Sequence, residues 1–161
     1  MQKIISDAIE KHEDKQKTAI YNAIQLLYQY TSWDGQQNAL YHLIYYQKDL
    51  VLIVKILFKK SIILQAVSVL LNKSISIVIL SLDQIGKEQT EYIVWISERP
   101  CFLNADTISN KLLKKVEDAK YTYLLMSSEL AVSKRLYKII LELKFKNQLA
   151  LVVVDEAYLV A

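Results

Sequence analysis

The chain has 161 residues, 53% of them hydrophobic, and 20 basic against 17 acidic side chains give it a formal net charge of +3. This length suits about one domain with a buried core, and the weak positive charge permits a nucleic-acid partner without requiring one. The single cysteine excludes a disulfide framework and a thiolate metal site. Four lysines interrupt the apolar region 50–82 and the amino terminus lacks a signal-like apolar core, so we expect a protein that is neither secreted nor in a membrane.

Two amphipathic helices are predicted near the amino terminus. Apolar residues recur at spacings of three and four within residues 2–30 and again within residues 36–47. Between these two stretches, Asp34 and Gly35 are typical of a turn. We therefore expect two helices separated by a turn.

Beyond residue 48, short apolar runs alternate with helical patterns. Runs of strand length occur at 50–54, 74–81, 121–126 and 149–154, and the first and last are typical of buried strands. Helical patterns occupy 62–71, 83–93, a stretch that ends near residue 119, and 133–145. Asp106 or Thr107 is the expected N-cap of the third of these helices, because either side-chain oxygen accepts a hydrogen bond from the first helical turn. Strands that alternate with helices imply right-handed crossovers and a parallel sheet, so the expected fold class is α/β.

Two adjacent acids, Asp155 and Glu156, follow the last predicted strand. Ligands of an open α/β sheet bind beyond the carboxyl ends of its parallel strands, where carboxylates reach a metal ion or a water. Lys60 and Ser61 follow the first predicted strand. This order of parts is that of a P-loop nucleotidase, in which a lysine neutralises phosphates while a hydroxyl and an acid hold Mg²⁺.

Six stretches occur in the order of consecutive motifs of one helicase family. They are DGQQNAL (34–40), KDLVLIV with KKS (48–61), LSLDQIGKEQ (80–89), FLNADT (102–107), SSELAVS (127–133) and LALVVVDEAYLV (149–160). On these stretches the chain resembles the first RecA-like domain of RecQ-type DNA helicases, which belong to the DEAH/DExH-box proteins of superfamily 2. The resemblance covers residues 36–161. It implies a RecA-like P-loop nucleotidase fold, with a helical extension at 1–30 and an incomplete helicase ATP-binding domain at 31–161.

The resemblance implies a role for each matching residue of the nucleotide site. The adenine-reading glutamine is Gln37 if the spacing to the phosphate-loop lysine is kept, whereas the preceding glycine selects Gln36, and both assignments stay open. Lys60 takes the place of the phosphate-binding lysine, and Ser61 takes that of the hydroxyl that binds Mg²⁺. Asp155 takes the place of the acid that binds Mg²⁺, and Glu156 takes that of the catalytic base that activates water.

The resemblance also implies contacts with DNA. Three residues lie in the matching DNA-contacting motifs: Ser81, Gln89 and Ser128. The implied cofactors are ATP and Mg²⁺, and the implied partners are single-stranded or duplex DNA and a missing second helicase domain. The implied location is nuclear or elsewhere inside the cell.

The phosphate loop departs from the family pattern. The pattern GxxxxGK[ST] would place glycine at positions 54 and 59, where this chain has Val54 and Lys59. Glycine is used there because the backbone takes positive φ and approaches the phosphates closely. Without it, Phe58 is expected to occupy the phosphate site. Residues 55–61 are then either a strand-to-helix junction with solvated lysines or a remnant in which Lys59 or Lys60 still contacts phosphate.

Two functions follow as expectations. The first is an ATP-dependent 3′–5′ DNA helicase-like domain, degenerate and not active alone, because the loop glycines and the second domain are missing. Tyr158 replaces the histidine of the DEAH motif, which adds to this expectation. The alternative is a non-catalytic module that keeps the helicase fold and binds nucleic acid or protein. Whether the chain is an enzyme stays open between the two.

Overall fold

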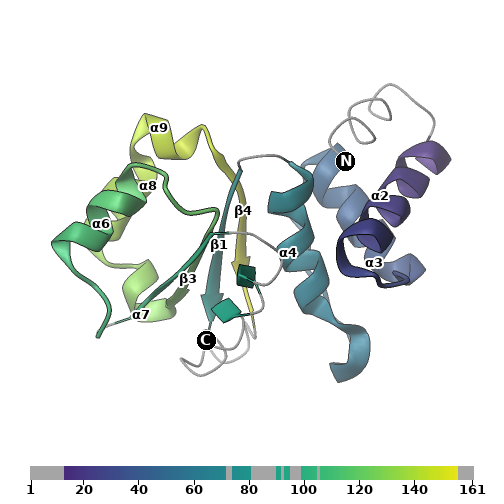
Figure 1. Cartoon of the computed structure of the whole chain (residues 1–161), viewed down its shortest axis with the longest axis horizontal. Coiled ribbons are helices and arrows are strands. Elements are labelled where there is room, and N and C mark those ends of the chain that lie inside the picture. The colour runs from purple at the N-terminus through teal and green to yellow at the C-terminus, as the bar shows by residue number, and fades with distance from the viewer. Residues whose placement is uncertain are drawn as a thin grey trace. The chain divides into compact units, whose positions relative to one another are not determined.

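The structure is a computed structural model that describes residues 13–71, 74–80, 90–91, 93–94, 99–104 and 106–155. The chain divides into two compact units, Met1–Asn72 (unit 1) and Lys73–Ala161 (unit 2). In the described residues, unit 1 is helical and unit 2 contains a sheet with helices (Figure 1). The predicted boundary after residue 30 rests on the resemblance and stays a prediction.

Unit 1 is built around helix α3 (Asp34–Tyr41), which packs against α2 (Glu13–Tyr28) and α4 (Lys60–Leu70). A π-helical turn, His42–Tyr46, follows α3, and a 3₁₀ turn, Ile56–Phe58, precedes α4. The apolar stripes of the three α-helices are buried: Ala19, Ile20, Ala23, Ile24, Ala39, Leu40, Ile63, Ala66 and Val67. This burial is the reason that the amphipathic pattern folds as helices.

The helix predictions for unit 1 are confirmed within the described residues, and two details are wrong. Asp34 and Gly35 do not form a turn, because they lie in the first turn of α3. Residues 50–54 do not form the predicted buried strand. They have no regular secondary structure, no strand of the sheet pairs with them, and Val51 and Ile53 are 86% and 92% exposed. A β-branched run becomes a strand only where a neighbouring strand accepts it.

The sheet of unit 2 contains four strands in the order β2-β3-β1-β4, and every neighbouring pair is parallel (Figure 1). The strands are β1 (Ile75–Leu80), β2 (Pro100–Leu103), β3 (Tyr123–Ser127) and β4 (Leu149–Val154). Helix α6 (Asn110–Glu117) connects β2 to β3, and α7 (Ser128–Ala131), α8 (Lys134–Leu141) and α9 (Leu143–Lys146) connect β3 to β4. The predicted α/β class, with a parallel sheet and flanking helices, is confirmed.

The hydrophobic core of unit 2 lies between the sheet and the helices α6, α8 and α9. Alternate strand residues meet apolar helix residues there: Ile75, Ile77, Cys101, Leu103, Leu124 and Met126 pack with Leu113, Val116, Leu136 and Phe145. Burial raises the pKa of the Cys101 thiol to about 11, although the nearby charge of Lys115 acts in the opposite direction. The thiol is therefore neutral near pH 7, and Cys101 is a core residue, as the sequence predicts.

Strand β4 is at the edge of this sheet, beside β1. The central strand β1 buries residues of both faces, whereas β4 alternates between half-buried and exposed residues. Val152 and Val154 are 53% and 45% exposed. The expectation of a buried last strand is therefore wrong for its alternate residues, although the predicted bounds of the strand are confirmed.

The start of α6 differs from the prediction. Ser109 is its N-cap, and the Ser109 hydroxyl oxygen accepts a hydrogen bond from the Leu112 N–H at 3.2 Å. Asp106 and Thr107 instead donate their N–H groups to the Asn104 carboxamide oxygen, at 3.1 and 2.9 Å, and form a turn after β2. Asp106, Thr107 and Ser109 are all residue types that cap helices. Because Asp106 and Thr107 belong to the turn at Asn104, Ser109 is the residue that caps α6.

Two further expectations concern helices. The predicted helix over 133–145 begins after its N-cap Ser133 and is interrupted at Glu142, where ψ is 132°. The predicted helix at 83–93 lies mostly outside the described residues. In the part of the chain that the structure describes, no helix combines the length and the apolarity needed to cross a membrane.

Candidate functional site

Gln36 joins the start of α3 to the segment that precedes α4. The side chain is fully buried; its Oε1 accepts a hydrogen bond from the Trp33 N–H at 2.9 Å, and its Nε2 donates to the Phe58 carbonyl at 2.6 Å. The first bond satisfies an amide at the helix N-terminus from the third helical position, as in a capping box. Both ends of the carboxamide are therefore engaged inside unit 1, and the side chain does not face solvent.

Gln37 is the more accessible of the two candidate adenine-reading residues. Its side chain is half-buried, and its Nε2 donates to the Ser32 carbonyl at 3.0 Å. Because Gln36 is buried and bonded at both ends, Gln37 is the one that remains near the surface. Its role in reading adenine stays a prediction.

Phe58 packs onto the first turn of α3. Its ring meets the Trp33 ring edge to face, with the centroids 5.8 Å apart and an interplanar angle of 73°. A Cβ atom at Gly35 would lie 3.2 Å from the same ring, so glycine at this position leaves the space that the ring needs. The ring of Phe58 therefore contacts Trp33 and Gly35, and its predicted obstruction of a phosphate site stays a prediction.

Lys59 has left-handed backbone geometry, with φ 54° and ψ 52°. It occupies the position where the family pattern has glycine, and a non-glycine residue in this geometry costs about 1–2 kcal/mol. Its Nζ lies 4.4 Å from the centroid of the Tyr30 ring, a cation–π distance. The ammonium of Lys59 therefore faces an aromatic ring of unit 1. The strand of the predicted strand-to-helix junction is absent at 50–54, and whether Lys59 contacts phosphate stays open.

The other predicted nucleotide-site residues lie in both units. Lys60 and Ser61 are the first two residues of α4 in unit 1. Asp155 follows β4 in unit 2, and its N–H donates to the Ile79 carbonyl at 3.0 Å, so the pairing of β4 with β1 continues into Asp155. Glu156 lies outside the described residues. The roles predicted for these four residues stay predictions.

Ser128 and Asp155 both lie at the carboxyl ends of strands of the sheet. It is the first residue of α7, directly after β3, and Ser127 caps that helix by accepting from the Leu130 N–H at 3.4 Å. The pKa of the Glu129 carboxyl is lowered by its own backbone N–H and by the hydroxyls of Ser127 and Ser128. These bonds hold Ser128 in a structured turn. The two other predicted DNA-contacting residues, Ser81 and Gln89, lie outside the described residues.

Metal ligands do not gather within the described residues. There, no group of three or more His, Cys, Asp or Glu side chains is placed to hold a metal ion. Mg²⁺ beside a nucleotide needs no such group, because phosphates and waters supply most of its ligands, so the prediction that Asp155 and Ser61 bind Mg²⁺ stays a prediction.

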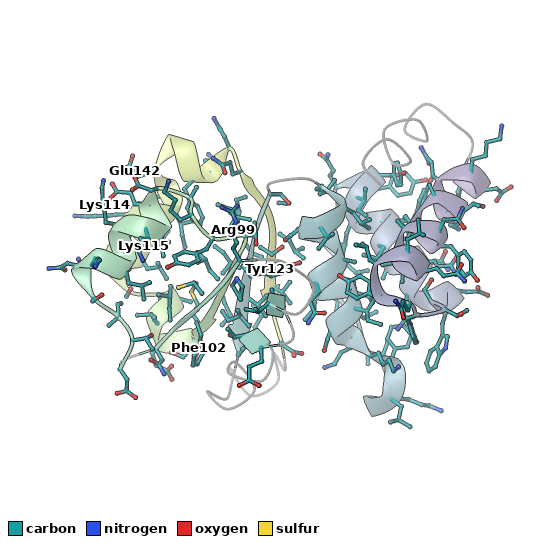
Figure 2. The ribbon with its side chains drawn as sticks, in the orientation of Figure 1. Arg99, Phe102, Lys114, Lys115, Tyr123 and Glu142 are labelled. Atoms are coloured by element: carbon teal, nitrogen blue, oxygen red, sulfur yellow. The ribbon has the colours of Figure 1, made fainter. Side chains whose placement is uncertain are left out.

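The outer surface of α6 and α8 is a functional candidate that the motif comparison misses. Six exposed basic residues, here called the basic face, lie on these helices: Lys111, Lys114, Lys115, Lys134, Arg135 and Lys138. Figure 2 labels Lys114 and Lys115 on α6 and Phe102 and Tyr123 on the sheet. Lysines at spacings of three and four on two amphipathic helices are the sequence signal for such a face.

Comparison with known proteins adds no family assignment. No protein-family model matches the chain, and no curated protein matches it. The likeness to RecQ-type helicases therefore depends on the six sequence stretches and their order. What the chain does has to be argued from its own residues.

Proposed function

We propose that the chain is a degenerate RecQ-type helicase domain, of RecA-like P-loop descent, that binds nucleic acid without hydrolysing ATP. The observation that carries this proposal is the pair of hydrogen bonds by which Gln36 joins Trp33 to Phe58. These bonds tie the segment that resembles the phosphate loop to the helix that resembles the adenine-reading motif. A nucleotide would have to separate the two.

The residues of this loop do not fit a bound triphosphate. A phosphate loop offers consecutive backbone N–H groups to the phosphate oxygens. Here the Phe58 N–H donates to the Lys55 carbonyl at 3.0 Å, and the Ile62 N–H donates to the Lys59 carbonyl at 3.2 Å. The Phe58 carbonyl points to Gln36, and the Phe58 ring packs on α3. No catalytic step is therefore assigned to Lys60.

The nucleic-acid part of the proposal has separate support in unit 2. Parallel strands place Ser128 and Asp155 at the carboxyl edge of the sheet, which is where ligands of such sheets bind. The sheet is compatible with a RecA-like domain, and the six matching stretches lie in the order of that family. In this proposal, the changed loop before α4 accounts for the loss of ATP hydrolysis, and the sheet with its basic helices still binds nucleic acid.

Binding of a labelled single strand tests this function. We expect a thymidine oligonucleotide of about 20 nucleotides to bind with a micromolar Kd, measured by fluorescence anisotropy at low salt. Millimolar Mg²⁺ and ATP should leave the Kd unchanged, and Lys60→Ala should bind like the wild type. DNA-stimulated release of phosphate from ATP, lost in Lys60→Ala, would contradict the proposal, and so would a tenfold change of Kd on adding ATP.

A further inference from the structure

Helices α6 and α8 concentrate the positive charge of the chain. Helix α6 carries three lysines and one acid, Glu117, and α8 carries two lysines, one arginine and no acid. Six basic residues against one acid give these two helices a net charge of +5, whereas the whole chain has +3. The other residues together are therefore net acidic. A weak net charge of the whole chain is therefore compatible with one strongly basic surface.

The packing of the two helices presents these charges to solvent. Leu113 and Val116 of α6 and Leu136 of α8 are buried in the core of unit 2. The two helices pack together, and the Arg135 guanidinium donates to the Asn110 carboxamide oxygen of α6. With the apolar sides turned to the sheet, all six side chains of the basic face are exposed. They form one surface made of two adjacent helices.

Most of this charge has no acidic partner within the described residues. Lys114 pairs with Glu117, with 3.0 Å between Nζ and Oε2, and this pairing raises the pKa of Lys114. No ion pair joins the other five cations to an acid of the described chain. Glu117 and Asp118 act on Lys114, but the cations of the basic face outnumber these acids. An excess of cations attracts a polyanion, because binding releases the counterions of that polyanion.

The apolar surface of the face favours a nucleic acid over a membrane. An interfacial helix inserts a wide apolar side into lipid, but Leu113, Val116 and Leu136 are buried in the core of unit 2, which leaves Tyr137 and Leu141 as the exposed large apolar residues of α6 and α8. Tyr137 is 58% exposed and lies on α8 between Lys134 and Lys138. An exposed aromatic ring among cations is the combination that binds an unpaired base and its phosphates.

We propose that the basic face binds the phosphate backbone of single-stranded nucleic acid, with the Tyr137 ring stacked on one base. The proposal rests on the proposed function, because it names the surface that performs the binding. It differs from the DNA contacts that the resemblance implies, which involve Ser81, Gln89 and Ser128. The strand runs over the outer side of the helical layer of unit 2.

Removal of charge tests the location of the surface. Wild-type binding of the thymidine oligonucleotide should weaken with salt with a log–log slope of about −4, since six phosphate contacts each contribute about 0.7. The triple variant Lys111→Gln, Lys134→Gln, Lys138→Gln should bind at least about tenfold more weakly, with a slope smaller by about 2. A matched control removes three exposed lysines of unit 1: Lys15→Gln, Lys48→Gln, Lys55→Gln. The control should keep the wild-type slope.

Removal of the ring tests the stacking. Tyr137→Ala should weaken binding about fivefold or more and leave the salt slope unchanged. Because all of these positions are exposed, circular dichroism should show the same fold in every variant. Equal losses in the two triple variants would overturn this surface and leave the proposed function standing. No binding of the oligonucleotide by the wild-type chain would overturn both, and tighter binding to phosphatidylserine vesicles than to the oligonucleotide would overturn the choice of ligand.

Discussion

Gln36→Ala should lower the free energy of unfolding by about 2–4 kcal/mol, because two partly buried backbone groups each lose a hydrogen-bond partner. The groups are the Trp33 N–H, three positions before Gln36, and the Phe58 carbonyl, 22 positions after it, and the Gln36 carboxamide bridges them. Truncation also leaves a cavity at a side chain that is fully buried. The loss should appear in unit 1, to which both partners belong.

Gln37→Ala is the matched control, because it changes the same residue type at the next position of α3. Gln37 is half-buried, and its side chain donates one hydrogen bond to the Ser32 carbonyl, so we expect a loss below about 1 kcal/mol. The measurement is urea unfolding followed by Trp33 fluorescence in a Trp95→Phe background, which leaves one tryptophan. Equal losses for the two variants would contradict the bridging role of Gln36.

Leu136→Ala should destabilise unit 2 by about 2–5 kcal/mol, the usual cost of a buried leucine truncated to alanine. Leu136 is 1% exposed and belongs to the cluster that joins the helices to the sheet. Leu141→Ala on the same helix is the control. Leu141 is 53% exposed, so we expect a change within about 0.5 kcal/mol.

Cys101 is a reporter for this second experiment. It is the single cysteine, it lies in the same core, and burial holds its thiol neutral. A thiol reagent should therefore label it mainly after unit 2 opens. Leu136→Ala should raise the labelling rate at least about 30-fold, the equivalent of 2 kcal/mol, and Leu141→Ala should leave it nearly unchanged. Similar rates for the two variants would show that the core does not depend on Leu136.

Local patterns in the sequence account for much of the fold. Apolar runs of strand length predict β1, β3 and β4. For the central strands β1 and β3 the reason is that both faces are buried, whereas the edge strand β4 is apolar although its alternate residues are exposed. Strand β2 escapes prediction because it has four residues and begins with Pro100. The run at 50–54 misleads for the opposite reason: its residues suit a strand, but no strand of the sheet pairs with it. Strand pairing is a long-range property that composition does not contain.

Some features of the candidate site can likewise be predicted from the local sequence, and others cannot. The absence of glycine from residues 55–61 and the size of Phe58 predict an obstructed loop from sequence alone. The structure shows Phe58 packed on Trp33, and the obstruction stays a prediction. The bridging role of Gln36 is not predictable locally, because its second partner is far away in the sequence. The basic face is not predictable from the local sequence either, for a related reason. Its charges belong to two helices, and only their packing makes them one surface.

Calorimetric titration of the chain with ATP and Mg²⁺ shows whether the loop before α4 is closed to nucleotides by its own residues. We expect no binding at ATP concentrations up to millimolar, for the wild type and for Lys60→Ala alike. Binding in the micromolar range that Lys60→Ala abolishes would contradict this expectation.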